Sequence, residues 1–322
     1  MDVLVIGSAV ADVLARPLPE GGWQEKQRIE TVRLYPGGDA LNQSIRLADA
    51  GVSAGILCVL GKDAGGDMVT AALGRRGVDC SLIRYREDVP TGMSLVLVKE
   101  NGERHIFAAR GAHATLCKED LEGLDLTGLK ALSLASLFSM PFLEDDGMAA
   151  FLERVRKKGI PIFADLASDK RGQKIGGVRP FLPLIDFFLP SLPDAAALLG
   201  LPMPEKTGND KADTEAVWAL ARETALRLRA EGAHTLVIKC GAAGAYYMNE
   251  EKEGRIPAPV LTPADVTGAG DCMAALLIHR LLAGSSLPEA ITYACAGASV
   301  STLSEGASAV PLCEEEIVRY MP

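Results

Sequence analysis

The stretch Asp265-Val-Thr-Gly-Ala-Gly-Asp271 decides the fold of this chain, and an apolar run over residues 272–282 follows it directly. Glycines at the start of a helix turn free backbone N–H groups in one direction, and the helix dipole adds about half a positive charge there. Such a turn suits a phosphate group. Asp271, in the first turn of the expected helix, is placed to act as a general base for an alcohol that attacks a phosphoryl group. The plainer alternative is a loop followed by a favourable first-turn carboxylate.

A second glycine-rich stretch, Gly37-Gly38-Asp39-Ala40-Leu41-Asn42, precedes another expected helix. Paired glycines let a ligand approach the backbone, and Asn42 could present its amide to a hydroxyl. Asp12 follows the first expected strand, and ligands of open α/β sheets bind at the carboxyl ends of strands. Taken singly, the glycine-rich motif favours a plain loop with Asn42 as an exposed helix residue, and Asp12 alone is ambiguous.

Apolar segments with the length of buried strands alternate along the chain with amphipathic helical segments. This alternation predicts an α/β fold: a doubly wound, mostly parallel sheet with helices on both faces. The expected strands are 3–6, 54–60, 131–136, 161–165, 186–189 and 235–239, and the expected helices are 38–50, 63–76, 148–158, 195–199, 214–230, 269–283 and 288–303.

Two segments, near 8–36 and 92–110, break this rhythm and predict a small sheet that projects from the main one. Within the second segment, residues 93–99 and 104–109 alternate around Asn101-Gly102, which is a strong hairpin signal.

Composition excludes several classes of protein. Of 322 residues, 48% are apolar and 23% charged, as in globular proteins. The net charge of −9 argues against binding of nucleic acid. The seven cysteines form no C-x-x-C pair, so reduced thiols in the cytoplasm are expected. No basic leader precedes residue 3, and His279 and Arg280 interrupt the longest apolar helix, so neither export nor membrane insertion is expected.

Motifs of other nucleotide-binding and hydrolytic enzymes are missing from the sequence. Gly61-Lys62-Asp63 lacks the spacing of a Walker A loop, and no G-x-G-x-x-G follows the first strand. Neither H-E-x-x-H nor G-x-S-x-G occurs.

The two glycine-rich stretches, in this order and about 230 residues apart, resemble the two signatures of the ribokinase-like (PfkB) carbohydrate kinases. The resemblance covers essentially the whole chain. Further landmarks agree in order, namely Gly61-Lys-Asp63, Thr91-Gly92, Gly102-Glu-Arg104, Val237-Ile-Lys-Cys-Gly241 and Gly306-Ala307.

The resemblance implies one ribokinase-like α/β domain over residues 1–322, with a β lid formed by about 8–36 and 89–112 that covers a sugar. It also implies transfer of the γ-phosphoryl of ATP to a sugar hydroxyl with Mg²⁺. Asp271 would be the general base, beside an anion hole of backbone N–H groups from Gly268, Ala269 and Gly270. The residues implied on the sugar side are Asp12, Gly37, Gly38, Asn42, His113 and Asp165, and those on the ATP side are Lys239, Gly241, Gly244, Ser191 and Asp194.

The chain departs from the family pattern at three places. The Asn-x-x-Glu motif reads Ser191-Leu-Pro-Asp194, where Asp194 keeps a carboxylate that could support Mg²⁺ through water. The family's Asp-x-Asn motif is replaced here by Asp165-Leu-Ala167, and its Gly-Ala-Asn motif by Gly111-Ala-His113. Both places bear on substrate choice, so the identity of the sugar stays open. Part of the family binds a monovalent cation such as K⁺ near the positions of Asp265 and 304–309, and its dependence here is also open.

Two alternative functions and the oligomeric state stay open. A nucleoside kinase would place aromatic rings around a base, and the lid segments hold just Trp23, Tyr35 and Phe107, which weakens that interpretation. A non-catalytic sugar or nucleotide sensor would keep the fold without turnover. Pairing of two lids would cover their free face, so a homodimer through the lid is predicted. An acidic sugar is favoured if two or three cations converge among Arg16, Arg33, Arg104, Arg110, Lys170 and Arg171.

Overall fold

The computed structural model describes residues 1–18, 28–99 and 104–322. Its main sheet has eight strands in the order β14-β13-β12-β11-β10-β9-β1-β4. The strands from β4 to β12 run parallel, and β13 and β14 are antiparallel additions at one edge. The bounds are β1 Val3–Ile6, β4 Ala54–Leu57, β9 Ala131–Leu137, β10 Ile162–Leu166, β11 Phe187–Phe188, β12 Thr235–Lys239, β13 Ala245–Met248 and β14 Glu253–Ile256.

Helices cover both faces of this sheet, and its strands are therefore buried on both sides. Successive residues of a strand point to opposite faces, and in β1 all four side chains are buried. Leu4 and Ile6 join one core cluster, whose helices are α3 Pro141–Asp145, α4 Met148–Lys157, α5 Ile175–Val178, α6 Leu192–Leu198 and α7 Asp210–Ala230. Val3 and Val5 join the other, with α1 Asp39–Asp49, α2 Ala64–Arg75, α8 Ala269–Leu282, α9 Leu287–Ser301 and α10 Glu314–Val318.

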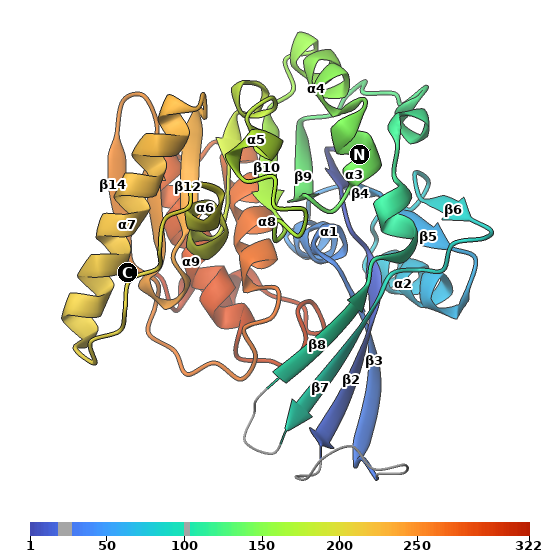
Figure 1. Cartoon of the computed structure of the whole chain (residues 1–322), viewed down its shortest axis with the longest axis horizontal. Helices are drawn as coiled ribbons and strands as arrows, with labels where there is room; N and C mark the ends of the chain where they lie inside the picture. The colour runs from blue at the N-terminus through green and yellow to red at the C-terminus, as the bar shows by residue number, and fades with distance from the viewer. Residues whose placement is uncertain (19–27, 100–103) are drawn as a thin grey trace.

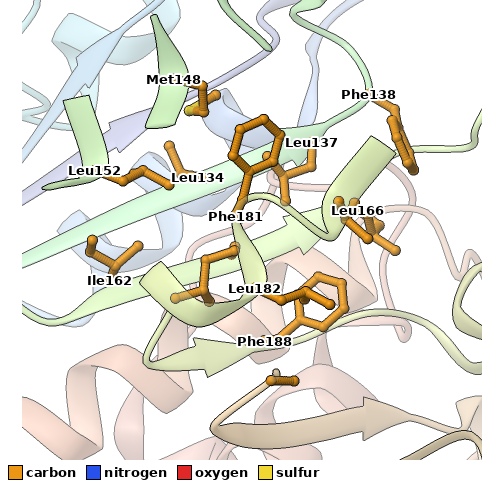
Figure 2. Packing of buried hydrophobic residues seen from close by; sticks show 14 of the residues in the cluster. Leu134, Leu137, Phe138, Met148, Leu152, Ile162, Leu166, Phe181, Leu182 and Phe188 are labelled. Atoms are coloured by element: carbon orange, nitrogen blue, oxygen red, sulfur yellow. The ribbon is translucent and has the colours of Figure 1, made fainter. Parts of the chain in front are cut away.

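Figure 2 shows the first cluster from close by, with Phe181 and Leu182 packed among apolar side chains of the sheet and of α4. Phe181 and Leu182 belong to the connection that leads into β11. The part of the chain that the structure describes also contains four short 3-10 helices: η1 Gly111–Thr115, η2 Lys118–Leu121, η3 Leu182–Leu184 and η4 Gly241–Ala243. The doubly wound, mostly parallel sheet predicted from the sequence is confirmed.

A second, four-stranded sheet projects from the main one (Figure 1). Its order is β3-β2-β7-β8, with bounds β2 Val10–Leu18, β3 Thr31–Gly37, β7 Met93–Lys99 and β8 Arg104–Ala109. The two segments that break the βα rhythm therefore form the small sheet that was expected. The Asn101-Gly102 turn lies outside the described residues.

The prediction of one strand over residues 54–60 was wrong. The chain forms β4 in the main sheet and then β5 (Val59–Gly61), which pairs with β6 (Arg84–Arg86) in a sheet of two strands. Every residue from 54 to 60 is buried, so the apolar pattern contains no sign of the break. Within the described residues, no helix is both long and apolar enough to cross a membrane.

Candidate active site

A cavity of about 620 Å³ opens at the carboxyl ends of β10 and β12 and at the N-terminus of α8. This is the edge of an open α/β sheet where ligands bind. The cavity wall carries a cluster of charged residues that act on one another, Asp39, Asp165, Asp194, Lys239 and Asp271. The wall also contains many apolar residues, among them Met203, Val217, Leu261, Pro263, Met273, Cys295 and Ala298. A cavity that offers both apolar and charged side chains can take a flat base and its phosphates together.

The glycine-rich turn before α8 lies on the wall of this cavity. Gly268 caps the helix with φ +74°, a conformation that favours glycine. A Cβ at Gly268 would lie 2.4 Å from the Cβ of Ala307. The loop around Ala307 is tied to the same turn, because the Asp265 carboxylate accepts a hydrogen bond of 3.0 Å from the Gly306 N–H. The first N–H groups of α8 consequently face the cavity and can receive an anion.

Asp271 is buried within the charged cluster and is held by a neighbour distant in sequence. Asn42 Nδ2 donates to Asp271 Oδ2 at 2.9 Å, and Ser308 Oγ donates to Asn42 Oδ1 at 3.3 Å. Burial raises the pKa of Asp271 well above its usual value, and the negative charge of Asp39 adds to the rise. A carboxylate of raised pKa, fixed in place, has the properties of a general base.

Lys239 and Asp165 form an ion pair across the sheet, between Lys239 Nζ and Asp165 Oδ2. Burial raises the pKa of Asp165, and Lys239 opposes that rise. Asp39 is a site residue that the sequence reasoning missed. Burial and the charge of Asp165 raise its pKa to about 6. Its position between Gly38 and Asn42, inside a quoted motif, was the signal that could have identified it.

The predicted ATP-side residues gather at the cavity. Lys239, Gly241, Gly244, Ser191 and Asp194 all line it. Ser191 Oγ accepts from the Asp194 N–H at 3.2 Å, which caps α6, and donates to Asp194 Oδ2 at 2.5 Å. No three metal-ligating side chains cluster in the described part of the chain. A single carboxylate is nonetheless enough for Mg²⁺ where phosphates and waters supply the other ligands.

The predicted sugar-side residues divide into three places. Asp165 lines the cavity, and Asn42 reaches it through Asp271. Asp12 lies at the base of the small sheet, where a Cβ at Gly37 would sit 2.0 Å from Asp12 Oδ2. Burial raises the pKa of Asp12. Gly38, next to it, has φ +98°, and a Cβ there would lie 2.6 Å from the Ser8 carbonyl oxygen.

His113 lies in η1, close to Gly92 at the base of the small sheet. Its Nδ1 is buried and has no hydrogen-bond partner among the described residues. A Cβ on Gly92, at the start of β7, would come within 2.6 Å of it. Burial lowers the pKa of His113 to about 4, and the positive charges of Arg110 and Lys170 add to this effect. His113 is therefore neutral at physiological pH and is near two cations.

The other candidate cations are engaged elsewhere. Arg16 and Arg33 both meet Glu305, with Arg16 donating to both of its carboxylate oxygens at 2.7 and 3.0 Å. Arg171 donates to both oxygens of Asp145. The side chain of Arg104 lies outside what the structure describes.

Comparison with known proteins agrees with this geometry. The family model "pfkB family carbohydrate kinase" matches residues 1–313. A ribokinase of Arabidopsis thaliana is 26% identical over 313 residues, which are 95% of this chain and 77% of that protein. A solved structure of Arabidopsis thaliana ribokinase with ribose and ATP has a TM-score of 0.80 at 23% identity and covers 99% of this chain and 97% of its own. An E. coli protein described as a candidate ribokinase II, in complex with ATP and Mg²⁺, has a TM-score of 0.78 at 21% identity, covering 99% and 98%.

Proposed function

The chain belongs to the PfkB family of carbohydrate kinases, and from this membership and the site we propose that it transfers the γ-phosphoryl of ATP to a sugar hydroxyl with Asp271 as the general base. The observation that carries the base assignment is the burial of Asp271 in the first turn of α8, beside the glycine-rich turn. Asn42 orients the carboxylate, and the turn receives the phosphoryl group in transfer.

ATP fits the mixed lining of the cavity. Its base would lie against the apolar residues, and its phosphates would reach the N–H groups of Gly268, Ala269 and Gly270. Mg²⁺, held by Asp194 through water, would neutralise phosphate charge when bound. The small sheet would act as a lid over the sugar within a single domain, excluding water that would otherwise hydrolyse ATP. The dependence on K⁺ stays a prediction.

We further propose that the sugar is acidic, either a sugar acid or a sugar phosphate. Arg110 and Lys170 both act on His113, and neither forms an ion pair with a carboxylate among the described residues. Arg110 follows the end of β8 and caps η1, the turn that carries His113. Two residues before it, Ala108 is paired through Ser94 with Asp12. Guanidinium groups bind carboxylate and phosphate through two hydrogen bonds.

Replacing Arg110 with Gln should raise the KM for an acidic sugar by about 10–100-fold, as expected for loss of a charge-assisted hydrogen bond. The KM for ATP should stay within about threefold. The measurement is coupled ADP release over neutral pentoses and hexoses, aldonic acids, sugar phosphates and nucleosides. Arg171→Gln is the matched control, because Arg171 is already paired with Asp145. Preferred turnover of a neutral sugar would contradict the acidic substrate and leave the kinase assignment standing.

The nucleoside kinase alternative finds little support in the aromatic residues. Phe107 is paired with Leu95, which is paired with Val13, so it lies on the face of the small sheet opposite Asp12. Tyr35 is paired with Asp12 and shares its face, and its hydroxyl accepts a hydrogen bond from Arg33, so it is the one aromatic ring of the described lid strands that this register puts on the Asp12 side. Trp23 lies outside the described residues. We place the enzyme in the cytoplasm, in keeping with its seven free cysteines.

We also propose a homodimer formed through the lid. Leu34, Val13, Leu95 and Phe107 are consecutive partners across the sheet and share one face. Leu34 is 60% exposed and Phe107 is 57% exposed. An apolar row of this kind on the outer face of a sheet is covered most simply by a second copy about a twofold axis.

Leu34→Glu is expected to convert the dimer to a monomer, because it places a charge within the paired apolar face. Sedimentation velocity across a hundredfold range of concentration measures this. Ile106→Glu is the control, since Ile106 is 64% exposed and lies on the opposite face of β8 from Phe107. A wild-type chain that is monomeric over the whole range would rule out the dimer.

A further inference from the structure

Lys239 is the one cation among the described residues that line the cavity, where it faces Asp39, Asp165, Asp194 and Asp271. Bound ATP would add its phosphate charges to this acidic wall. Repulsion between like charges in a buried site is costly, so the single ammonium group has a large effect on how the phosphates are held.

The position of Lys239 is fixed by its neighbours in the sheet. It is the last residue of β12, and its N–H donates to the Pro190 carbonyl at 2.9 Å. Its side chain is 12% exposed. Lys239 Nζ lies 3.3 Å from the place where a Cβ on Gly270 would be. The ammonium therefore lies against the glycine-rich turn of α8 while it is paired with Asp165.

We propose that Lys239 is a catalytic residue whose ammonium group contacts the phosphoryl group in transfer, and that Asp165 is a positioning residue that holds this ammonium at the glycine-rich turn before the nucleotide binds. This role rests on the proposed kinase function. The sugar oxygen attacks the γ-phosphorus, and the bond to the β–γ bridging oxygen breaks. The bridging oxygen leaves with the electron pair as part of ADP, and the hydroxyl proton passes to Asp271. Lys239 neutralises charge on the equatorial oxygens throughout.

A purely structural ion pair would behave differently. Breaking a buried pair from either side leaves an uncompensated charge and destabilises the fold. Lys239→Met and Asp165→Asn would then both lower the stability of the fold, and both would weaken the binding of ADP and of the ATP analogue by the same factor. In the catalytic role the two changes have opposite effects on the γ-phosphate, because one removes its cation and the other removes the carboxylate that competes for that cation.

The test measures binding of ADP and of the non-hydrolysable β,γ-methylene analogue of ATP by calorimetry, with Mg²⁺ in both cases. Lys239→Met should weaken binding of the analogue by about 10–100-fold and of ADP by less than about threefold, and should lower kcat by about 10²-fold or more. Asp165→Asn should raise the affinity for the analogue relative to ADP. Lys130→Met is the control, since Lys130 is paired with Asp2 and does not line the cavity.

The outcomes separate this inference from the kinase assignment. A wild-type chain that turns over a sugar while Lys239→Met loses ADP and analogue affinity equally overturns the role of Lys239 alone. The role is also overturned if Lys239→Met and Asp165→Asn shift the ratio of the affinity for the analogue to the affinity for ADP equally and in the same direction. If the wild type releases no ADP with any sugar of the panel, the proposed kinase function is contradicted. The ratio of the affinities for the analogue and for ADP still tests the contact of Lys239 with the γ-phosphate.

Discussion

Asp271→Asn is expected to lower kcat by about 10²–10⁴-fold, the usual contribution of general base catalysis. The amide has the shape of the carboxylate and keeps an oxygen for the hydrogen bond from Asn42, so the site should stay assembled. It cannot accept the proton of the attacking hydroxyl. The measurement is coupled ADP release at saturating sugar and ATP, with ATP binding checked by calorimetry and expected to stay within about threefold.

Glu289→Gln is the matched control for this change. Glu289 occupies the same capping position in α9 that Asp271 occupies in α8, three residues after the cap, and its carboxylate accepts from Ser286. A residue that merely favours the start of a helix should behave like Glu289, losing some stability and keeping kcat. If the activity of Asp271→Asn stays within tenfold of wild type, Asp271 is not the general base. It is then only a carboxylate that favours the first turn of α8.

The same assignment fixes the direction of the pH dependence. The pKa of Asp271 is raised by burial and by the charge of Asp39. Only the ionised carboxylate accepts a proton, so kcat/KM should fall as the pH drops through this raised pKa. The acid limb should therefore lie above the range of an exposed aspartate, near pKa 3.9. An acid limb in that ordinary range would show that some other group accepts the proton.

The sequence was most informative where one short segment contains both the glycine-rich turn and the side chain that would act as the base. Gly268 and Asp271 are three residues apart on one helix turn, so their relation could be read from spacing alone. The alternation of strands and helices likewise predicted the sheet. The break at Cys58 was not predictable, because apolar residues continue on both sides of it.

Contacts between distant segments could not be predicted in this way. Asn42 was expected to hold sugar hydroxyls, yet its amide also holds Asp271, 229 residues away. The pairing of Lys239 with Asp165 spans 74 residues and two strands of the sheet. Nothing in the sequence next to Asn42 or Lys239 indicates which distant side chain it contacts. Such contacts depend on the strand order, which is a property of the whole fold.

Gly268→Ala is expected to lower kcat by about 10²–10³-fold, comparable with the loss of a hydrogen-bond donor from an oxyanion hole. The new methyl group would lie 2.4 Å from the Ala307 Cβ and 2.9 Å from its Cα. Backbone atoms of that loop cannot rotate aside as a long side chain would. Either the loop or the glycine-rich turn must shift, and a displacement of the N–H groups of Ala269 and Gly270 weakens their contact with the phosphoryl group.

Gly284→Ala separates this effect from simple backbone strain. Gly284 follows the other end of α8 with φ +88°, and no atom lies within 4 Å of its Cβ position. Both variants carry the cost of a left-handed alanine, about 1–2 kcal/mol, so both should melt a few degrees below wild type. Only Gly268→Ala should lose kcat. Equal kcat in the two folded variants would mean that the turn before α8 does not hold the transferring phosphoryl group.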